Sequence, residues 1–335
     1  MSDPRAQVTG LITAAWSTQA IGVAARLKLF DLLAAGPRPS SELATETGSH
    51  PGALFRLMRA LASLDLLRHL GGDRFELTEA GQLLRSDTPG SIRGMALHWG
   101  QRLWGALSQL DESVRTGKAW RVSGAEGFEE MSRDPAQLAM FHRSMTDQTR
   151  GVAKAILQAC DFSRFRTVVD VGGSQGALLA AILQAHPGLT GQSFDLPGLE
   201  GDAKAYLEEA GVSDRGRFTG GSFFEAVPPG ADAYLLKMII HDWYDEEAVR
   251  ILDNTRQAAG KTGVVLVMER IVPALATTAP ADHVTLRGDI LMLTAAGGME
   301  RTEAEYHDLF GRAGLAIRSI SPTASGFSVI EASAA

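Results

Sequence analysis

A histidine and two glutamates that follow it in the chain have residue types and positions suited to proton transfer. His241 comes directly after the strand-like run 234–240, and Glu269 ends a second apolar run. An imidazole titrates near neutral pH, so His241 is placed to act as a general base. A nearby carboxylate fixes the tautomer of an imidazole and stabilises its cation, and Glu269 or Glu300 can supply it. For Glu300, an ion pair with Arg301 or a cap on the following helix stays open.

A glycine-rich loop points to a second kind of chemistry. The β-branched run 167–171 leads into Gly172-Gly173-Ser174-Gln175-Gly176, whose spacing differs from the dinucleotide and phosphate-loop patterns. Such a loop lets a ligand approach the backbone closely, and the helix after it offers free N–H groups. Asp195 ends the next predicted strand, where a carboxylate suits the two hydroxyls of a ribose. These features predict a nucleoside ligand.

These residues need a scaffold, and the second half of the chain supplies one. Strand-like and helix-like segments alternate from residue 167 onward, which indicates a mainly parallel sheet covered on both faces. The ends of its strands would gather the polar groups at one edge, where ligands bind in open sheets. The expected strands are 167–171, 191–195, 233–238, 264–269 and a closing hairpin of 317–320 with 327–331; the expected helices are 177–184, 199–210, 245–259 and 303–313.

The first 115 residues have the apolar spacing of helices and one winged-helix pattern. That pattern comprises a helix from residue 40 with a hydroxyl cap, a turn at 48–51, a helix over 53–67 and a hairpin of strands 67–70 and 74–78. The second helix offers Arg56 and Arg59 but is otherwise apolar, whereas a DNA-reading helix needs polar side chains. We expect residues 1–100 to form an oligomerisation domain and 101–335 a second domain, with its nucleotide fold from about residue 150.

Composition narrows the classes of partner and compartment. The 335 residues carry a net charge of -7, which is unfavourable for binding phosphates, so we expect no nucleic-acid partner. The one cysteine, Cys160, excludes an internal disulfide or a cysteine-rich metal site. The first residues lack a secretory pattern, and no apolar run approaches the ~20 residues that cross a bilayer. We expect a cytoplasmic protein without membrane contact.

The motifs D-V-G-G-S-Q-G, F-D-L-P, G-G-S-F-F, L-L-K-x-x-x-H-D-W-Y-D-E-E and G-G-M-E-R-T, in this order, resemble those of S-adenosylmethionine (SAM)-dependent O-methyltransferases of the caffeate/hydroxyindole type. The resemblance covers nearly the whole chain. It implies an α/β fold, with a Rossmann-like methyltransferase domain after a mostly helical winged-helix dimerisation domain. It also implies a homodimer, S-adenosylhomocysteine as product, no metal, and an aromatic natural-product intermediate as substrate.

The same resemblance assigns roles to residues of this chain. His241 matches the catalytic base, with Glu269 and Glu300 as its carboxylate partners. The cofactor-binding residues it implies are Gly172 at the methionine part, Asp195 at the ribose, Leu196, Ser222, Phe223 and Lys237 around the adenine, Met145 near the reacting methyl and Thr149 near the methionine end. Ser222 stands where many members have Asp, and Ser174 where many have a third glycine.

The predicted reaction moves a methyl group from SAM to a phenolic hydroxyl, with His241 taking the proton. A flat aromatic acceptor needs apolar walls, although the same side chains also suit ordinary core packing. The candidate walls are Trp99, Trp104, Phe141, Met145 and Met292. Alternatives are a family member that catalyses hydroxylation, decarboxylation or cyclisation instead, a winged-helix transcription regulator, and a nicotinamide oxidoreductase, which the glycine spacing disfavours.

Overall fold

The computed structural model describes residues 3–88, 90–120, 133 and 135–335. The chain divides into two compact units. Unit 1 comprises Met1–Gly105 with Ala136–Gln148, and unit 2 comprises Ala106–Pro135 with Thr149–Ala335. The domain boundary at residue 100 stays a prediction. The two compact units do not divide the chain at one point, because each of them contains part of the long helix Pro135–Ala159.

Unit 1 has the helix, turn, helix and hairpin that the sequence predicts. The hairpin strands β2 (Leu67–His69) and β3 (Arg74–Leu77) are antiparallel, and the short strand β1 (Arg38–Pro39) pairs with β3. The helices of this unit are α1 (Pro4–Thr13), α2 (Ala15–Arg26), α3 (Leu29–Leu32), α4 (Ser40–Thr47), α5 (Pro51–Ser63), α6 (Glu79–Gln82), α7 (Arg93–His98), the π-helical η1 (Trp99–Leu103) and the start of α8 (Trp104–Leu107).

Helix α5 supports the interpretation of a buried rather than a DNA-reading helix. Leu54, Met58 and Leu61 of α5 are buried in the core of unit 1. The helix begins at Pro51, two residues before the expected start, because proline fits the first helical turn, where its missing N–H is not needed. The expected hydroxyl cap of α4 is wrong: its N-cap is Pro39, and Ser40 is already helical.

The amino-terminal helices correct one expectation about the sequence. The helical stretch Pro4–Arg26 is 23 residues long with a mean hydropathy of 1.2, so by length and composition alone it could cross a membrane. One such helix near the amino terminus is weak evidence of a span. Its large apolar side chains are nevertheless exposed: Val8, Leu11, Ile12 and Trp16 show 54, 67, 73 and 46% of their surface.

Unit 2 is built on a seven-stranded sheet within its described residues, in the order β11-β12-β8-β7-β4-β5-β6. Neighbours from β6 to β8 pair in parallel, and β11 and β12 are antiparallel, as expected for a closing hairpin. The strands are β4 (Thr167–Val171), β5 (Thr190–Asp195), β6 (Gly216–Gly220), β7 (Ala233–Lys237), β8 (Val264–Glu269), β11 (Leu315–Pro322) and β12 (Ser328–Ala334). The predicted α/β fold is confirmed.

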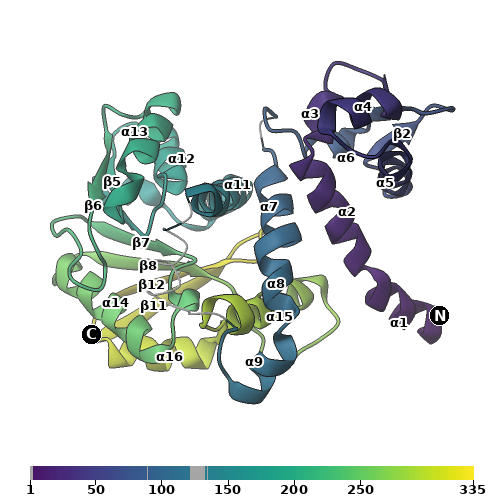
Figure 1. Ribbon diagram of the computed structural model, residues 1–335. Helices are drawn as coiled ribbons and strands as arrows, with labels where there is room; N and C mark the ends of the chain where they lie inside the picture. Colours follow the sequence, from purple (N-terminus) through teal and green to yellow (C-terminus); the bar gives the residue numbers. More distant parts are fainter. Residues whose placement is uncertain (1–2, 89, 121–132, 134) are drawn as a thin grey trace. The chain divides into compact units, whose positions relative to one another are not determined.

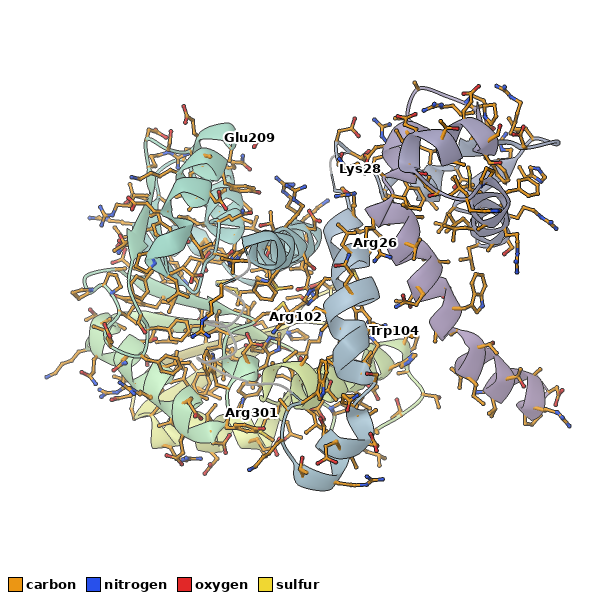
Figure 2. All side chains as sticks on the ribbon, in the orientation of Figure 1. Arg26, Lys28, Arg102, Trp104, Glu209 and Arg301 are labelled. Atoms are coloured by element: carbon orange, nitrogen blue, oxygen red, sulfur yellow. The ribbon has the colours of Figure 1, made fainter. Side chains whose placement is uncertain are left out.

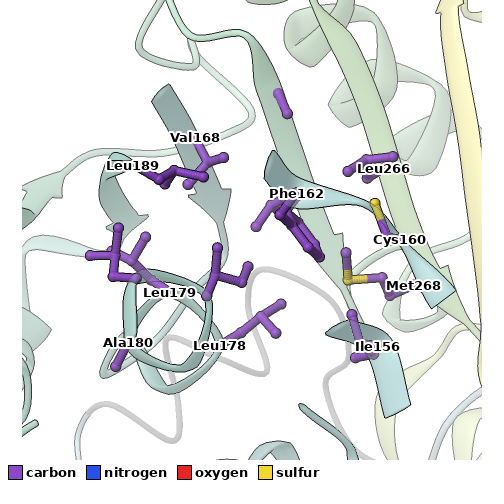
Figure 3. Packing of buried hydrophobic residues seen from close by; sticks show 14 of the residues in the cluster. Ile156, Cys160, Phe162, Val168, Leu178, Leu179, Ala180, Leu189, Leu266 and Met268 are labelled. Atoms are coloured by element: carbon purple, nitrogen blue, oxygen red, sulfur yellow. The ribbon is translucent and has the colours of Figure 1, made fainter. Parts of the chain in front are cut away.

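Helices cover both faces of this sheet (Figure 1). Successive strand residues point to opposite faces, so Val168 and Leu235 join one core cluster, whereas Val169 and Leu236 join the other. The helices α11 (Pro135–Ala159), α12 (Ala177–Ala185) and α13 (Glu200–Glu209) contribute to the first cluster, and α14 (Asp245–Ala259) and α16 (Glu303–Arg312) to the second. Figure 3 shows the first cluster, in which Leu178 and Leu179 of α12 pack beside the strands.

Some elements escape the sequence patterns. The edge strand β6 has the sequence Gly-Arg-Phe-Thr-Gly, with one large apolar residue and no alternation to read. Unit 2 also contains elements that none of the sequence patterns predicts. They are η2 (Phe162–Arg164), η3 (Pro197–Leu199), η4 (Ile240–Asp242), β9 (Ile271–Val272), α15 (Pro280–Leu291), the π-helical η5 (Met292–Ala296) and β10 (Arg301–Thr302). Helix α9 (Leu110–Thr116) lies at the end of the stretch that the sequence predicts to be helical.

Candidate active site

The catalytic candidate His241 lies in a 3-10 turn, Ile240–Asp242, at the carboxyl end of β7. Strand β8 runs parallel to β7 with Met268 opposite Lys237, which brings Glu269, the last residue of β8, to this turn. One oxygen of Glu269, Oε1, accepts the backbone N–H groups of Ile239, Ile240 and His241 at 3.0, 2.9 and 3.3 Å. Glu269 therefore fixes the start of the turn by satisfying its unpaired donors.

The imidazole of His241 is surrounded by carboxylates. Its Nδ1 lies 3.0 Å from Glu300 Oε1 and 3.5 Å from Glu269 Oε2, and its Nε2 lies 3.6 Å from Asp242 Oδ1. An ionised carboxylate only accepts hydrogen bonds, so Nδ1 carries a proton and Nε2 is the nitrogen left for proton transfer. The structure thus brings together all of the predicted catalytic residues.

Burial and these neighbours act in opposite directions on the charge of His241. Burial lowers the pKa of the imidazole, but Glu269, Glu300 and Asp242 outweigh it and raise the pKa to about 10. Burial also raises the pKa of Glu269 to about 7, against the lowering effect of His241. The site therefore stabilises an imidazolium, which is the form His241 takes after accepting a proton.

Glu300 neither pairs with Arg301 nor caps the following helix. Arg301 pairs with Asp245 Oδ1 at 2.8 Å, and the cap of α16 is formed by Thr302 and Glu305. Both alternative roles of Glu300 are therefore wrong, and its Oε1 is used by the His241 ring. One ligand-type atom each of His241, Glu269 and Glu300 lies within 4.8 Å of the others, close enough for a metal ion. A metal-free site stays a prediction, and the 3.0 Å spacing of Nδ1 and Glu300 is that of a hydrogen bond.

The glycine loop and Asp195 adjoin at the carboxyl ends of β4 and β5. Asp195 accepts the backbone N–H of Ser174 at 2.8 Å and that of Leu196 at 2.7 Å, one on each oxygen. Each carboxylate oxygen can accept a second hydrogen bond, so the side chain still fits a ribose diol. Gly172 has a φ of +71°, and a Cβ there would collide with Ile239 and lie 3.7 Å from Phe223. Asp195 therefore fits the ribose of a nucleoside, whereas the Cβ position of Gly172 is filled by the side chain of Ile239.

Other predicted cofactor residues lie near the same edge. Lys237 ends β7, and burial lowers its pKa to about 8, although Asp170 counteracts this. Asp170 is buried in β4 with its Oδ2 unpaired among the described residues, and burial raises its pKa to about 7. The Ser222 hydroxyl accepts the backbone N–H of Phe224 at 3.3 Å, so it already serves a local turn. Leu196 is 46% exposed beside Asp195.

The remaining candidates are divided between the units. Unit 1 contains four of the proposed pocket residues: Trp99, Trp104, Phe141 and Met145. Unit 2 contains Thr149, buried in α11, and Met292, half-buried at the start of η5. Within unit 1, the Phe141 ring lies 5.9 Å from the ring of His98. Trp104, which is labelled in Figure 2, is 39% exposed. Their joint role as pocket walls stays a prediction.

Sequence reasoning missed residues that the structure places at the site. Asp242 was visible only as the neighbour of His241, and Arg301 only as a possible ion-pair partner of Glu300. Tyr306 gave no signal, because it lies within the amphipathic pattern of a helix far along the chain. The Tyr306 side chain is fully buried, and Glu269 and Glu300 raise its pKa further above the usual range than burial alone. Arg301 is 1% exposed.

Comparison with known proteins agrees with this geometry. A family model described as an O-methyltransferase domain matches residues 107–316, and one described as an O-methyltransferase dimerisation domain matches residues 9–87. A phenazine O-methyltransferase of Lysobacter antibioticus is 37% identical over 324 residues, which cover 96% of this chain and 94% of that protein.

Two further similarities concern the acceptor atom and the cofactor. An 8-amino-8-demethylriboflavin N,N-dimethyltransferase of Streptomyces davaonensis is 37% identical over 92% of this chain and 89% of that protein. The crystal structure of human N-acetylserotonin methyltransferase in complex with SAM has a TM-score of 0.89 at 26% identity, covering 99% of this chain and 98% of that one. The chain belongs to the family of SAM-dependent O-methyltransferases.

Proposed function

We propose that this enzyme methylates a phenolic hydroxyl of an aromatic small molecule, with His241 as the general base. The observation that carries the proposal is the 3.0 Å contact between His241 Nδ1 and Glu300, which directs the ring's other nitrogen to proton transfer. The imidazole lies at the sheet edge where Asp195 and the glycine loop also end. A base and a nucleoside site at one edge suit methyl transfer to an oxygen.

The free-energy cost of ionising a phenol is of the size that a general base can offset. A phenol with a pKa of ~10 is about one part in a thousand ionised at pH 7, which costs ~4 kcal/mol. His241 has a pKa of about 10 beside its carboxylates, so transfer of the phenolic proton to a neutral His241 is close to thermoneutral, and the neutral fraction of His241 grows as the pH approaches 10. Glu300 and Glu269 then hold the imidazolium. A positioned base of this kind typically contributes ~10²–10⁴ in rate.

The chain's own residues would hold the nucleoside and sulfonium ends of SAM. Asp195 would bind the ribose hydroxyls, and Gly172 would let the methionine part approach the backbone. Phe223 and Leu196 offer apolar surface for an adenine, with Lys237 and Ser222 near it. Met145 and Thr149 are assigned to the methyl and methionine ends. When bound, SAM supplies an electrophilic methyl group for the ionised oxygen.

One experiment with two variants tests these assignments. Purified enzyme is given methyl-labelled SAM and a panel of phenols, and product formation is compared with calorimetric SAM binding. We expect His241→Ala to lower turnover at least ~100-fold while binding SAM normally. Asp195→Ala should instead weaken SAM binding. Normal turnover of His241→Ala at neutral pH would show that the base lies elsewhere, and label that reaches no product would favour a non-methylating reaction.

Nitrogen is a second candidate acceptor, because a relative of comparable identity is an N,N-dimethyltransferase. An arylamine is already nucleophilic as the neutral base, so it needs no proton removed before attack. Each phenol in the panel is therefore paired with its amine. If His241→Ala still methylates the amines, nitrogen is the acceptor atom. If wild type methylates the phenols and His241→Ala does not, oxygen is the acceptor atom.

We also propose that the enzyme is a homodimer through its amino-terminal part. The match to a dimerisation domain covers residues 9–87, and the exposed apolar side chains of α1 and α2 lie in or next to that range. Burial against a second copy would remove Leu11, Ile12 and Trp16 from water. A cytoplasmic location, and the absence of nucleic-acid and membrane partners, stay predictions.

A further inference from the structure

Arg301 makes an unusual set of contacts for a charged side chain. It is 1% exposed and lies in β10, which pairs with β9. Figure 2 labels its side chain in unit 2. Its Nη1 donates to the carbonyl of Ile240 at 3.2 Å, and its Nη2 donates to the carbonyl of Trp243 at 2.9 Å. Asp245 neutralises it through contacts of 3.2 and 2.8 Å. The guanidinium therefore holds backbone carbonyls on both sides of His241.

The turn is tied from the other side as well. Glu269 accepts its N–H groups, and the backbone N–H of Met299 donates to the carbonyl of His241 at 2.9 Å. Met299 and Arg301 flank Glu300, whose side chain meets the His241 ring. In extended backbone, adjacent side chains point to opposite sides. Residues 299–301 thus bind both the ring and the backbone of one catalytic turn.

We propose that Arg301 is a positioning residue for the methyl-transfer reaction, holding the His241 turn so that the imidazole stays aligned between Glu300 and the acceptor oxygen. The inference rests on the proposed role of His241 as base. A buried arginine is costly unless its charge is paired and its donors are used. Here those donors go to Asp245, to the carbonyl groups of Ile240 and Trp243, and to the carbonyl of Met299 at 3.5 Å.

The chain offers a matched control. Arg312 pairs with the other oxygen of the same aspartate, Asp245 Oδ2, at 3.3 Å and with Glu246 at 2.7 Å, but it is 35% exposed and binds the side chains of α14. We expect Arg301→Met to lower kcat about 10- to 100-fold with SAM affinity unchanged, because a small displacement of a base has effects of this size. Arg301→Lys should recover part of the rate, and Arg312→Met should stay within about twofold of wild type.

A second readout separates positioning from general stability. His241 faces Asp242 of its own turn, Glu269 of β8 and Glu300, so its titration reports how well the ring is held among them. In ¹⁵N-histidine-labelled protein, assigned with His241→Ala, we expect the His241 titration midpoint to fall in Arg301→Lys, which keeps the positive charge beside the turn, and to stay unchanged in Arg312→Met. In Arg301→Met the loss of that charge raises the midpoint and opposes the fall, so the Lys variant decides. If Arg301→Met does not fold, Arg301→Lys and Asp245→Asn are measured in the same way.

These measurements separate a failure of the positioning role of Arg301 from a failure of the proposed role of His241. Folded Arg301 variants with wild-type kcat and an unmoved His241 midpoint would overturn the inference while leaving His241 as base. Loss of activity in step with loss of SAM binding and of folded protein would also overturn it, since Arg301 would then serve stability alone. Equal turnover of wild type and His241→Ala would instead overturn the proposed function.

Discussion

The charge of His241 is governed by the carboxylates of Glu269, Glu300 and Asp242, and this sets how activity depends on pH. A base must be neutral to accept a proton, and the pKa of about 10 leaves a small neutral fraction at pH 7. Below this pKa the neutral fraction grows tenfold per pH unit. We therefore expect kcat/KM for a phenol to rise about tenfold per unit between pH 7 and 9, measured from full pH–rate profiles.

Removal of one carboxylate should move this profile in a known direction. Glu300→Gln removes a negative charge at 3.0 Å from Nδ1, which lowers the pKa of His241. The rise of kcat/KM with pH should therefore begin at lower pH, and its maximum should be reduced. Glu303→Gln, on the exposed side of α16, is the control and should leave the profile unchanged. A Glu300→Gln profile that coincides with wild type would show that Glu300 does not set the charge of the base.

Ser174 is a second residue with a measurable consequence. It has a φ of +50°, a left-handed conformation in which a side chain is unfavourable, while its N–H binds Asp195. Ser174→Gly should raise the free energy of unfolding by about 0.5–1 kcal/mol in denaturant titrations. Glycine relieves the backbone strain, and the larger conformational entropy that it gives the unfolded chain offsets only part of this gain. Ser174→Ala keeps the Cβ and should give no such gain. Equal stabilities of the Gly and Ala variants would contradict this reading.

At the scale of elements, the site depends on how closely the segment before β10 packs on the His241 turn. A Cβ added to Gly298 would collide with the carbonyl oxygen of His241 and lie 2.7 Å from the nitrogen of Trp243. Gly298→Ala must therefore push the turn away. We expect a loss of stability of about 1–3 kcal/mol and a fall in kcat of at least about tenfold, measured by denaturation and steady-state kinetics.

Gly311 in α16 is the matched control for this substitution. A Cβ there has no described atom within 4 Å, and alanine is the better helix former. Gly311→Ala should keep wild-type kcat and gain up to about 1 kcal/mol. A fully active Gly298→Ala enzyme would show that the turn tolerates displacement, which would also weaken the case for tight positioning of His241.

At the scale of the whole molecule, the first two helices expose apolar side chains that a second copy would cover in the proposed homodimer. Ile12→Asp or Trp16→Asp should convert the homodimer into a monomer in light-scattering measurements, since burial of a charge in an apolar interface is costly. Leu275→Asp, at a residue 78% exposed in unit 2, should leave the dimer intact. A monomeric wild type, or dimeric variants, would exclude an interface formed by these helices.

Much of the scaffold follows from local pattern. The bounds of β8 and α14 match the predicted ranges residue for residue, because each is a buried or amphipathic segment with clear limits. The approach of Glu269 to His241 also follows, since parallel neighbouring strands end at one edge. By contrast, β6 has too little apolar pattern to be recognised, and α15 ends in a π-helical turn that no periodicity predicts.

The sequence by itself determined the α/β class and the edge of the sheet at which His241, Asp195 and the glycine loop meet, because strands that alternate with helices run parallel and bring their carboxyl ends to one edge. The resemblance to O-methyltransferases predicted which residues at that edge form the catalytic site and the cofactor site. Only the tertiary structure decided that Glu300 binds the ring of His241 whereas its neighbour Arg301 pairs with Asp245. Such choices depend on packing between segments some 60 residues apart, where desolvation and hydrogen-bond geometry, rather than residue type, select the partner.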